Sequence, residues 1–157
     1  MTGRAALLPV VILRDTMRYV PAKPYSLRLD GSTIHRLEEE AGRLRMPART
    51  LAQDLVEEGL RMRRHPIIRF VERTSGRRAA LVRRPRLSAA NVIETVRASA
   101  DLDEAADYLD LGRGELDQVL AYYAEFRDEV DAEIARAHEY AAREHRLWRE
   151  RQSPLER

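Results

Sequence analysis

The chain has 157 residues, which allows one medium-sized domain or two small ones. It contains no cysteine, which excludes disulfides and thiolate metal sites and favours the reducing cytoplasm. No apolar run approaches the length of a membrane span, so we expect no membrane partner.

The net charge of +2 conceals an uneven distribution. Up to Leu87 the chain has 19 basic and 9 acidic residues, a charge of +10, and from Ser88 onward it has 9 basic and 17 acidic residues, a charge of −8. A basic first half joined to an acidic second half predicts a nucleic-acid surface on the first half only. The alternative is an arginine-rich surface that is solvated and binds nothing.

Residues 1–22 form an N-terminal extension. Its apolar stretch, Ala5 to Leu13, is short, is interrupted by Pro9 and lacks a clear cleavage site, so we do not interpret it as a signal peptide. It could form an extra strand, and Met17 could be the true start of the protein.

Residues 23–64 predict one short strand and two amphipathic helices. From Tyr25 to Leu29, apolar and polar residues alternate, which is the period of a half-buried strand. Asp30 can cap the first helix, and residues 45–47 break it. The apolar positions at helical spacing are Ile34, Leu37, Ala41 and Leu44 in the first helix and Leu51, Leu55, Val56, Gly59 and Leu60 in the second.

This unit is incomplete in one chain. A single short strand leaves backbone groups unpaired, and two small helices cannot enclose a core. We therefore expect two copies to pair their strands into an antiparallel ribbon with the helices interlocked beneath it.

The order of elements resembles the ribbon-helix-helix fold of bacterial repressors and antitoxins, whose paired strands enter the major groove of DNA. The resemblance implies that the outward strand residues Ser26 and Arg28 contact bases, with Lys23 nearby. Arginine can bind guanine edges in a bidentate manner, and serine can donate to or accept from several bases. The alternative is that these residues form the solvated face of an ordinary edge strand.

The same resemblance implies a phosphate contact at the start of the second helix, through the backbone of Ala48, Arg49 and Thr50. Helix N-termini offer free N–H groups and the positive end of a dipole to such an anion. The chain departs from the family here, because many relatives have a Ser or Thr cap where this chain has Pro47.

Residues 65–87 predict a β-hairpin after His65, which is placed to end the second helix. Two apolar stretches, 67–72 and 79–82, flank a turn that contains Gly76. The arginines of this region are Arg69, Arg73, Arg77, Arg78, Arg83, Arg84 and Arg86. They would suit a wing that contacts phosphate, or a basic surface that faces the acidic site of a partner protein, and the sequence leaves both open.

From Ser88 the pattern is helical. Ser88 can cap a helix that carries Val92, Ile93 and Val96, and Asp101 with Glu104 can start a helix that carries Leu102, Ala105, Ala106 and Leu109. A turn at residues 111–114 precedes a helix whose buried face is expected to be Leu116, Val119, Leu120 and Tyr123. The outline matches a helix-turn-helix, but its second helix carries no basic side chain after Gly114, so we expect a protein-binding or structural unit.

From about His65 to Ile134, this order of elements looks like a small bacterial domain of unknown function found in VapB-type antitoxins, which are encoded beside PIN-domain ribonucleases. The similarity includes the Leu-Ala-Tyr-Tyr sequence at residues 120–123. It implies that the partner of this chain is a PIN-type ribonuclease toxin.

Residues 128–157 predict one long helix followed by a tail. Val130, Ile134, Ala137, Ala141 and Trp148 fall on heptad-like spacing. The resemblance implies that this segment binds the toxin and places an arginine in its carboxylate-lined metal site. The candidates are Trp148 as an apolar anchor with Arg143, Arg146, Arg149 and Arg151 around it. The alternative is that Trp148 packs on the chain's own helices and the arginines are solvated.

Nothing in the sequence predicts an enzyme. His138 and His145 are seven residues apart, whereas the zinc-protease pattern needs a spacing of four. There is no glycine-rich phosphate loop, cysteine nucleophile or nucleophile elbow. We expect no catalytic residue, metal or cofactor.

The sequence therefore predicts a mainly α protein with minor β structure. The expected parts are the extension at 1–22, a dimeric ribbon-helix-helix domain at 23–64, a hairpin with a helix-turn-helix-like domain at 65–127, and the C-terminal helix and tail at 128–157. The expected function is a cytoplasmic antitoxin that binds operator DNA and neutralises a ribonuclease toxin. The alternative is a stand-alone ribbon-helix-helix regulator, and a third possibility is a structural module that does not bind DNA.

Overall fold

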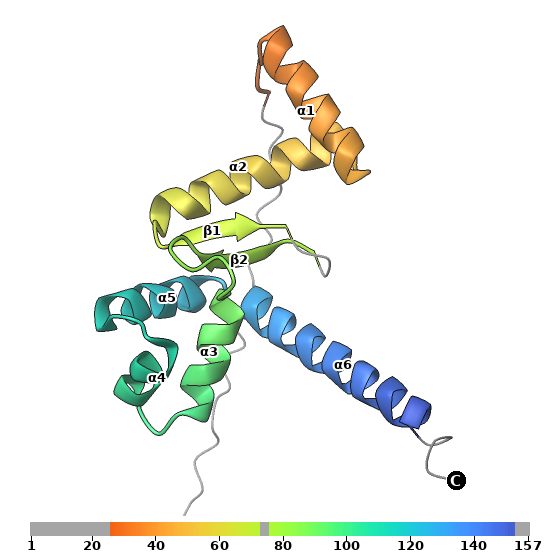
Figure 1. Cartoon of the computed structure of the whole chain (residues 1–157). Coiled ribbons are helices and arrows are strands. Elements are labelled where there is room, and N and C mark those ends of the chain that lie inside the picture. Colours follow the sequence, from red (N-terminus) through yellow and green to blue (C-terminus); the bar gives the residue numbers. More distant parts are fainter. Residues whose placement is uncertain (1–25, 73–75, 153–157) are drawn as a thin grey trace, which may run out of the picture.

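The structure, a computed structural model, describes residues 26–72 and 76–152 (Figure 1). The predicted extension at 1–22, Lys23 and Arg73 lie outside the described residues. The elements within them are α1 (Gly31–Leu44), α2 (Ala48–Arg64), β1 (Ile68–Val71), β2 (Arg78–Leu81), α3 (Ala89–Ala98), α4 (Leu102–Leu109), α5 (Arg113–Glu125) and α6 (Arg127–Gln152). The prediction of a mainly helical fold with a small hairpin and a long C-terminal helix is confirmed.

Helices α1 and α2 begin and end where the sequence predicts. The Asp30 carboxylate accepts a hydrogen bond from the Thr33 N–H at 2.9 Å and caps α1. These contacts, led by hydrogen bonds from the Ser32 and Thr33 hydroxyls, hold the pKa of Asp30 well below its usual range. Arg45 ends α1 in the left-handed conformation, with φ 54°, and Pro47 precedes the first turn of α2.

Residues 26–30 form no strand within the single chain, and all five are exposed. The predicted ribbon needs a second copy to pair with, so it stays a prediction.

The predicted hairpin is confirmed. Strands β1 and β2 pair antiparallel, from Ile68 opposite Leu81 to Val71 opposite Arg78. An isolated bridge between Ala80 and Ser88 brings the start of α3 against β2. The hairpin therefore lies between α2 and the helices that follow it (Figure 1).

The predicted caps of α3 and α4 are also confirmed. The Ser88 hydroxyl accepts a hydrogen bond from the Asn91 N–H at 3.1 Å, and Asn91 accepts one from the Ser88 N–H. Asp101 accepts from the N–H groups of Asp103 and Glu104, each at 2.9 Å. The predicted turn at 111–114 is shorter, because α5 already begins at Arg113.

One apolar core joins the hairpin, α3, α4, α5 and the first turns of α6. Its buried residues are Ile68, Ala79, Leu81, Ala89, Ala90, Val92, Ile93, Ala105, Ala106, Leu111, Leu116, Val119, Tyr122, Val130 and Ile134. We call the part of the chain from Ile67 to Ile134 the helical body. No residue of α1 or α2 belongs to this core cluster.

The prediction for the buried face of α5 is confirmed at Leu116 and Val119, whereas Leu120 is only partly buried and the buried tyrosine is not the predicted one. Tyr122 is fully buried, and Tyr123 is only partly buried, with its hydroxyl 3.2 Å from an Asp131 carboxylate oxygen. Tyr122 turns toward Phe126, four residues further along the chain, and toward His65, which the local sequence pattern does not place beside it.

Helix α6 starts in the core and then leaves it (Figure 1). Val130 and Ile134 are buried, whereas every residue from Ala135 to Gln152 is exposed. We call residues 135–152 the α6 tail. Among the described residues, no helix has both the length and the apolar composition needed to cross a membrane.

Candidate nucleic-acid and protein interfaces

An apolar surface is left open on the first part of the chain. Among the large apolar side chains of residues 26–64, only that of Leu51 is buried. Val56 is 54% exposed and Leu60 is 62% exposed. The members of this open apolar surface are Leu27, Leu29, Ile34, Leu55, Val56, Leu60 and Met62. A group of exposed apolar side chains of this size is typical of a surface that binds a partner.

Ser26 and Arg28, the predicted base-contacting residues, lie next to this surface in the chain. Both are exposed, and neither makes an ion pair or side-chain hydrogen bond within the described residues. They are available to a ligand, and their role stays a prediction.

The first turn of α2 is uncapped by any side chain. Pro47 has φ −63° and ψ 136°, and it makes no side-chain hydrogen bond to the helix. The Pro47 carbonyl accepts a hydrogen bond from the Leu51 N–H at 3.1 Å, and this is the first hydrogen bond of the helix. The N–H groups of Ala48, Arg49 and Thr50 precede it, so they have no acceptor within the helix. Arg49 and Thr50 are exposed, so an anion could reach this turn.

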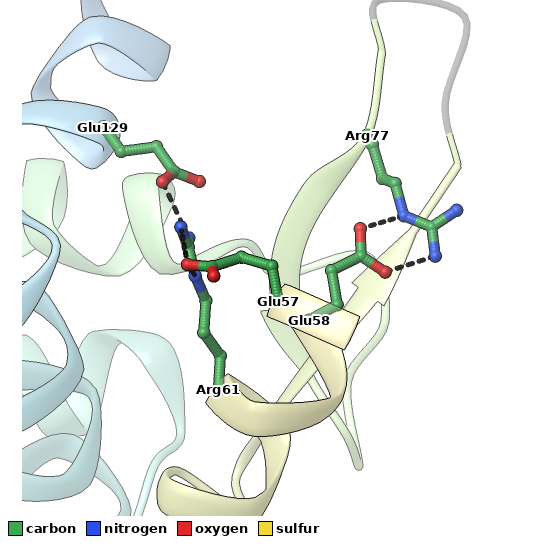
Figure 2. Close-up of polar contacts among 5 residues, drawn as sticks. All are labelled: Glu57, Glu58, Arg61, Arg77 and Glu129. Atoms are coloured by element: carbon green, nitrogen blue, oxygen red, sulfur yellow. Dashed lines mark hydrogen bonds and ion pairs between the residues drawn. The ribbon is translucent and has the colours of Figure 1, made fainter. Parts of the chain in front are cut away.

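Arg61 connects α2 to the helical body (Figure 2). Its guanidinium donates to Glu129 of α6 at 2.7 Å and to Glu57 of α2 at 3.0 Å. The same group lies over the ring of Phe126, 4.2 Å from its centroid. Burial works against the charged form, but the hydrogen bonds to Glu129 and Glu57 outweigh it, so the pKa of Arg61 is raised.

A second contact joins α2 to the hairpin. Arg77 of the hairpin makes two close contacts with the Glu58 carboxylate, which raise the pKa of Arg77 (Figure 2). Glu58 is only 7% exposed, so this carboxylate is removed from water. A buried carboxylate needs such a partner, because an unpaired charge in this position is costly.

A third contact joins the end of α2 to the end of α5. His65 Nε2 lies 3.0 Å from Glu125 Oε2, and Arg64 Nε lies 2.9 Å from the same oxygen. The His65 ring also meets the Tyr122 ring edge-on, with centroids 5.3 Å apart. We call the whole set the α2 junction: Glu57, Glu58, Arg61, Arg64 and His65 on the side of α2, and Arg77, Glu125, Phe126 and Glu129 on the side of the helical body.

The arginines of the hairpin region thus divide into two groups. Arg77, Arg78 and Arg84 bind the chain's own carboxylates, through Glu58, Glu133 and Asp110 respectively. Burial raises the pKa of Glu133, and Arg78 partly offsets this effect. The exposed arginines without an ion pair among the described residues are Arg69, Arg83 and Arg86. Part of the positive charge of this region is therefore paired with carboxylates of the same chain.

The α6 tail presents every predicted toxin-binding residue to solvent. Arg143, Arg146, Arg149 and Arg151 are exposed and make no ion pair within the described part of the chain. Trp148 is 56% exposed, and its ring stacks on the His145 ring of the same helix, with centroids 6.1 Å apart. The arginines are solvated in the single chain, as the alternative expects, and the toxin contact stays a prediction.

Neither histidine of α6 belongs to a cluster of three metal-ligating side chains within the described residues. His138 contacts Glu94 of α3 and ties the start of the α6 tail to the helical body. Within residues 26–72 and 76–152, no three side chains of the kinds that hold metals come together.

The sequence did not reveal the α2 junction. Arg61 and Glu129 are 68 residues apart, and only the pair of Glu57 and Arg61, four residues apart on one helix, could have been recognised.

Comparison of the chain with protein-family models, curated proteins and solved structures gives no match.

Proposed function

We propose that this protein is the antitoxin of a type II toxin–antitoxin pair and represses its own operator. In this proposal two copies form the DNA-binding unit, and the α6 tail neutralises a PIN-type ribonuclease. The observation that carries the proposal is the division of the chain into a closed helical body and two unpartnered surfaces, the open apolar surface and the α6 tail.

The open apolar surface supports the dimer. The helical body has its own core, yet Val56 and Leu60 of α2 face water in the single chain. A second copy would cover them and would bring two exposed 26–30 segments together as a ribbon. This arrangement also explains why so few residues of α1 and α2 are buried.

The DNA-binding step uses Ser26, Arg28 and backbone N–H groups that have no partner within the described residues. Arg28 and Ser26 of each copy, with Lys23 nearby, would contact base edges in the major groove. The N–H groups of Ala48, Arg49 and Thr50 would hold a phosphate on either side of the groove. The absence of a side-chain cap at Pro47 leaves these N–H groups without a competing acceptor.

The α6 tail supports the toxin-binding step. Its exposed Trp148 and Leu147 offer apolar contact area, and the exposed Arg143, Arg146, Arg149 and Arg151 can form bidentate pairs with carboxylates. Trp and Arg are the residue types that contribute most to protein interfaces. An arginine that pairs with the acidic ligands of a ribonuclease would displace its metal ion.

Co-expression with the product of the neighbouring gene tests the proposal. The full chain and a chain that ends after Ala137 would be compared by size-exclusion chromatography. The shorter chain keeps Val130 and Ile134, so the core of the helical body is intact. We expect a stable complex with the full chain only.

Two further outcomes would change the conclusion. A complex with both chains would move the toxin contact from the α6 tail to the helical body. No complex with either chain would favour the stand-alone regulator, and binding of the full chain to its own promoter would then separate that function from a module that does not bind DNA.

A further inference from the structure

Charged side chains make the ion pairs that join α2 to the helical body. Neither α1 nor α2 contributes a residue to the apolar core of the body. The connections are instead the ion pairs of Arg61 with Glu129, Arg77 with Glu58 and Arg64 with Glu125, together with the His65 ring and the Arg61 guanidinium against Phe126. Polar interfaces of this kind between parts of one chain commonly allow relative motion.

Most of the carboxylates in the α2 junction remain open to water. The side chains of Glu57, Glu129 and Glu125 are 59%, 53% and 32% exposed, whereas that of Glu58 is 10% exposed. Ion pairs that water and salt can reach are weakened by screening, whereas apolar packing is not. Added NaCl should therefore weaken the junction more than the body core.

We infer that the α2 junction is a salt-sensitive hinge, at which α1 with α2 and the helical body separate as two folded units when the ion pairs are screened or removed. The hinge lies between the first turn of α2 and the α6 tail, so its opening would change the distance between these two ends of the molecule (Figure 1). The contacts of the junction lie within one chain, but the folding of α1 with α2 as a separate unit rests on the dimer of the proposed function.

The experiment measures a distance across the junction with two spin labels. The chain has no native cysteine, so Gly42→Cys on α1 and Asp107→Cys on α4 provide the only attachment points. Both sites are exposed, and an added Cβ at Gly42 meets no other atom within 4 Å. The labelled chain is diluted with an excess of unlabelled chain, so that distances between copies do not contribute.

The test variant is Arg61→Gln with Arg77→Gln, which removes one cation from each side of the junction. The control is Arg36→Gln with Arg97→Gln, which causes the same change in net charge. Arg36 makes its contacts within α1, and Arg97 pairs with Asp131 within the helical body. Each protein is measured at about 0.1 M and about 1 M NaCl, which shortens the Debye length from roughly 10 Å to 3 Å. Circular dichroism is recorded on every sample.

We expect a narrow distance distribution for the wild type and the control at low salt. The test variant at low salt and the wild type at high salt should give a broad distribution with unchanged helical content. A distribution that stays narrow in the test variant at both salt concentrations would overturn the inference, because packing would then hold the junction closed. Broadening shared by the control, or broadening with loss of helix, would overturn it as well.

Discussion

Tyr122 has the largest fully buried side chain in the described part of the protein. The Tyr122 hydroxyl lies near the Arg61 guanidinium but makes no hydrogen bond. Burial raises the pKa of Tyr122 to about 12, an effect that Arg61 partly offsets. At neutral pH this residue is a neutral phenol whose polar atom is removed from water without full compensation.

Replacing this residue by phenylalanine should therefore cost nothing. We expect Tyr122→Phe to leave the free energy of unfolding unchanged or to raise it by up to about 1 kcal/mol, because the buried hydroxyl gains little in the folded state. Urea denaturation measures the effect. Tyr108→Phe, at a side chain that is 81% exposed, is the matched control and should have no effect. A loss of stability specific to Tyr122→Phe would mean that the hydroxyl has a bonded partner.

At the scale of elements, the start of α3 depends on one residue. Ser88 is 4% exposed, its hydroxyl accepts from the Asn91 N–H, and its backbone bridges to Ala80 of β2. The cap thus fixes where the hairpin ends and where the helices of the body begin. Local chemistry here sets the position of two elements at once.

The Ser88→Ala variant should lower the free energy of unfolding by about 1 to 2 kcal/mol, because the first turn of α3 loses its side-chain acceptor. Thermal denaturation followed by circular dichroism measures this change. Ser99→Ala is the control, since Ser99 lies at the other end of α3 and its hydroxyl donates only to the Thr95 carbonyl. Equal losses in the two variants would show that the N-cap has no special role.

At the scale of the whole molecule, the proposed dimer depends on the open apolar surface. A charged residue placed in it should prevent a second copy from binding, because the charge would have to be buried without a partner. We expect Val56→Glu to halve the molar mass measured by light scattering and to abolish operator binding. Val82→Glu, at an exposed valine of the hairpin region, should change neither.

Retention of the dimer in Val56→Glu would place the contact between copies elsewhere. Loss of the dimer in both variants would point to a general effect of added charge. Either result would remove the support that the open apolar surface gives to a dimeric ribbon.

The sequence by itself determined most of the helix ends and the hairpin, but the strand expected at residues 25–29 stays a prediction. Helix caps at Asp30, Ser88 and Asp101 and the break before Pro47 all appear where local chemistry predicts them. These features depend on contacts among neighbours in the chain, so residue type and spacing carry enough information. The hairpin was predictable for the same reason.

Only the tertiary structure decided how the elements meet. The contact of Arg61 with Glu129 joins residues far apart in the chain, and Tyr122 rather than Tyr123 packs against the distant His65. The spacing of Leu55, Val56 and Leu60 likewise predicted an apolar face on the second helix. It did not predict that the helical body leaves this face exposed. Periodicity shows which side of a helix is apolar, whereas the partner that covers that side is set by long-range packing that no local pattern encodes.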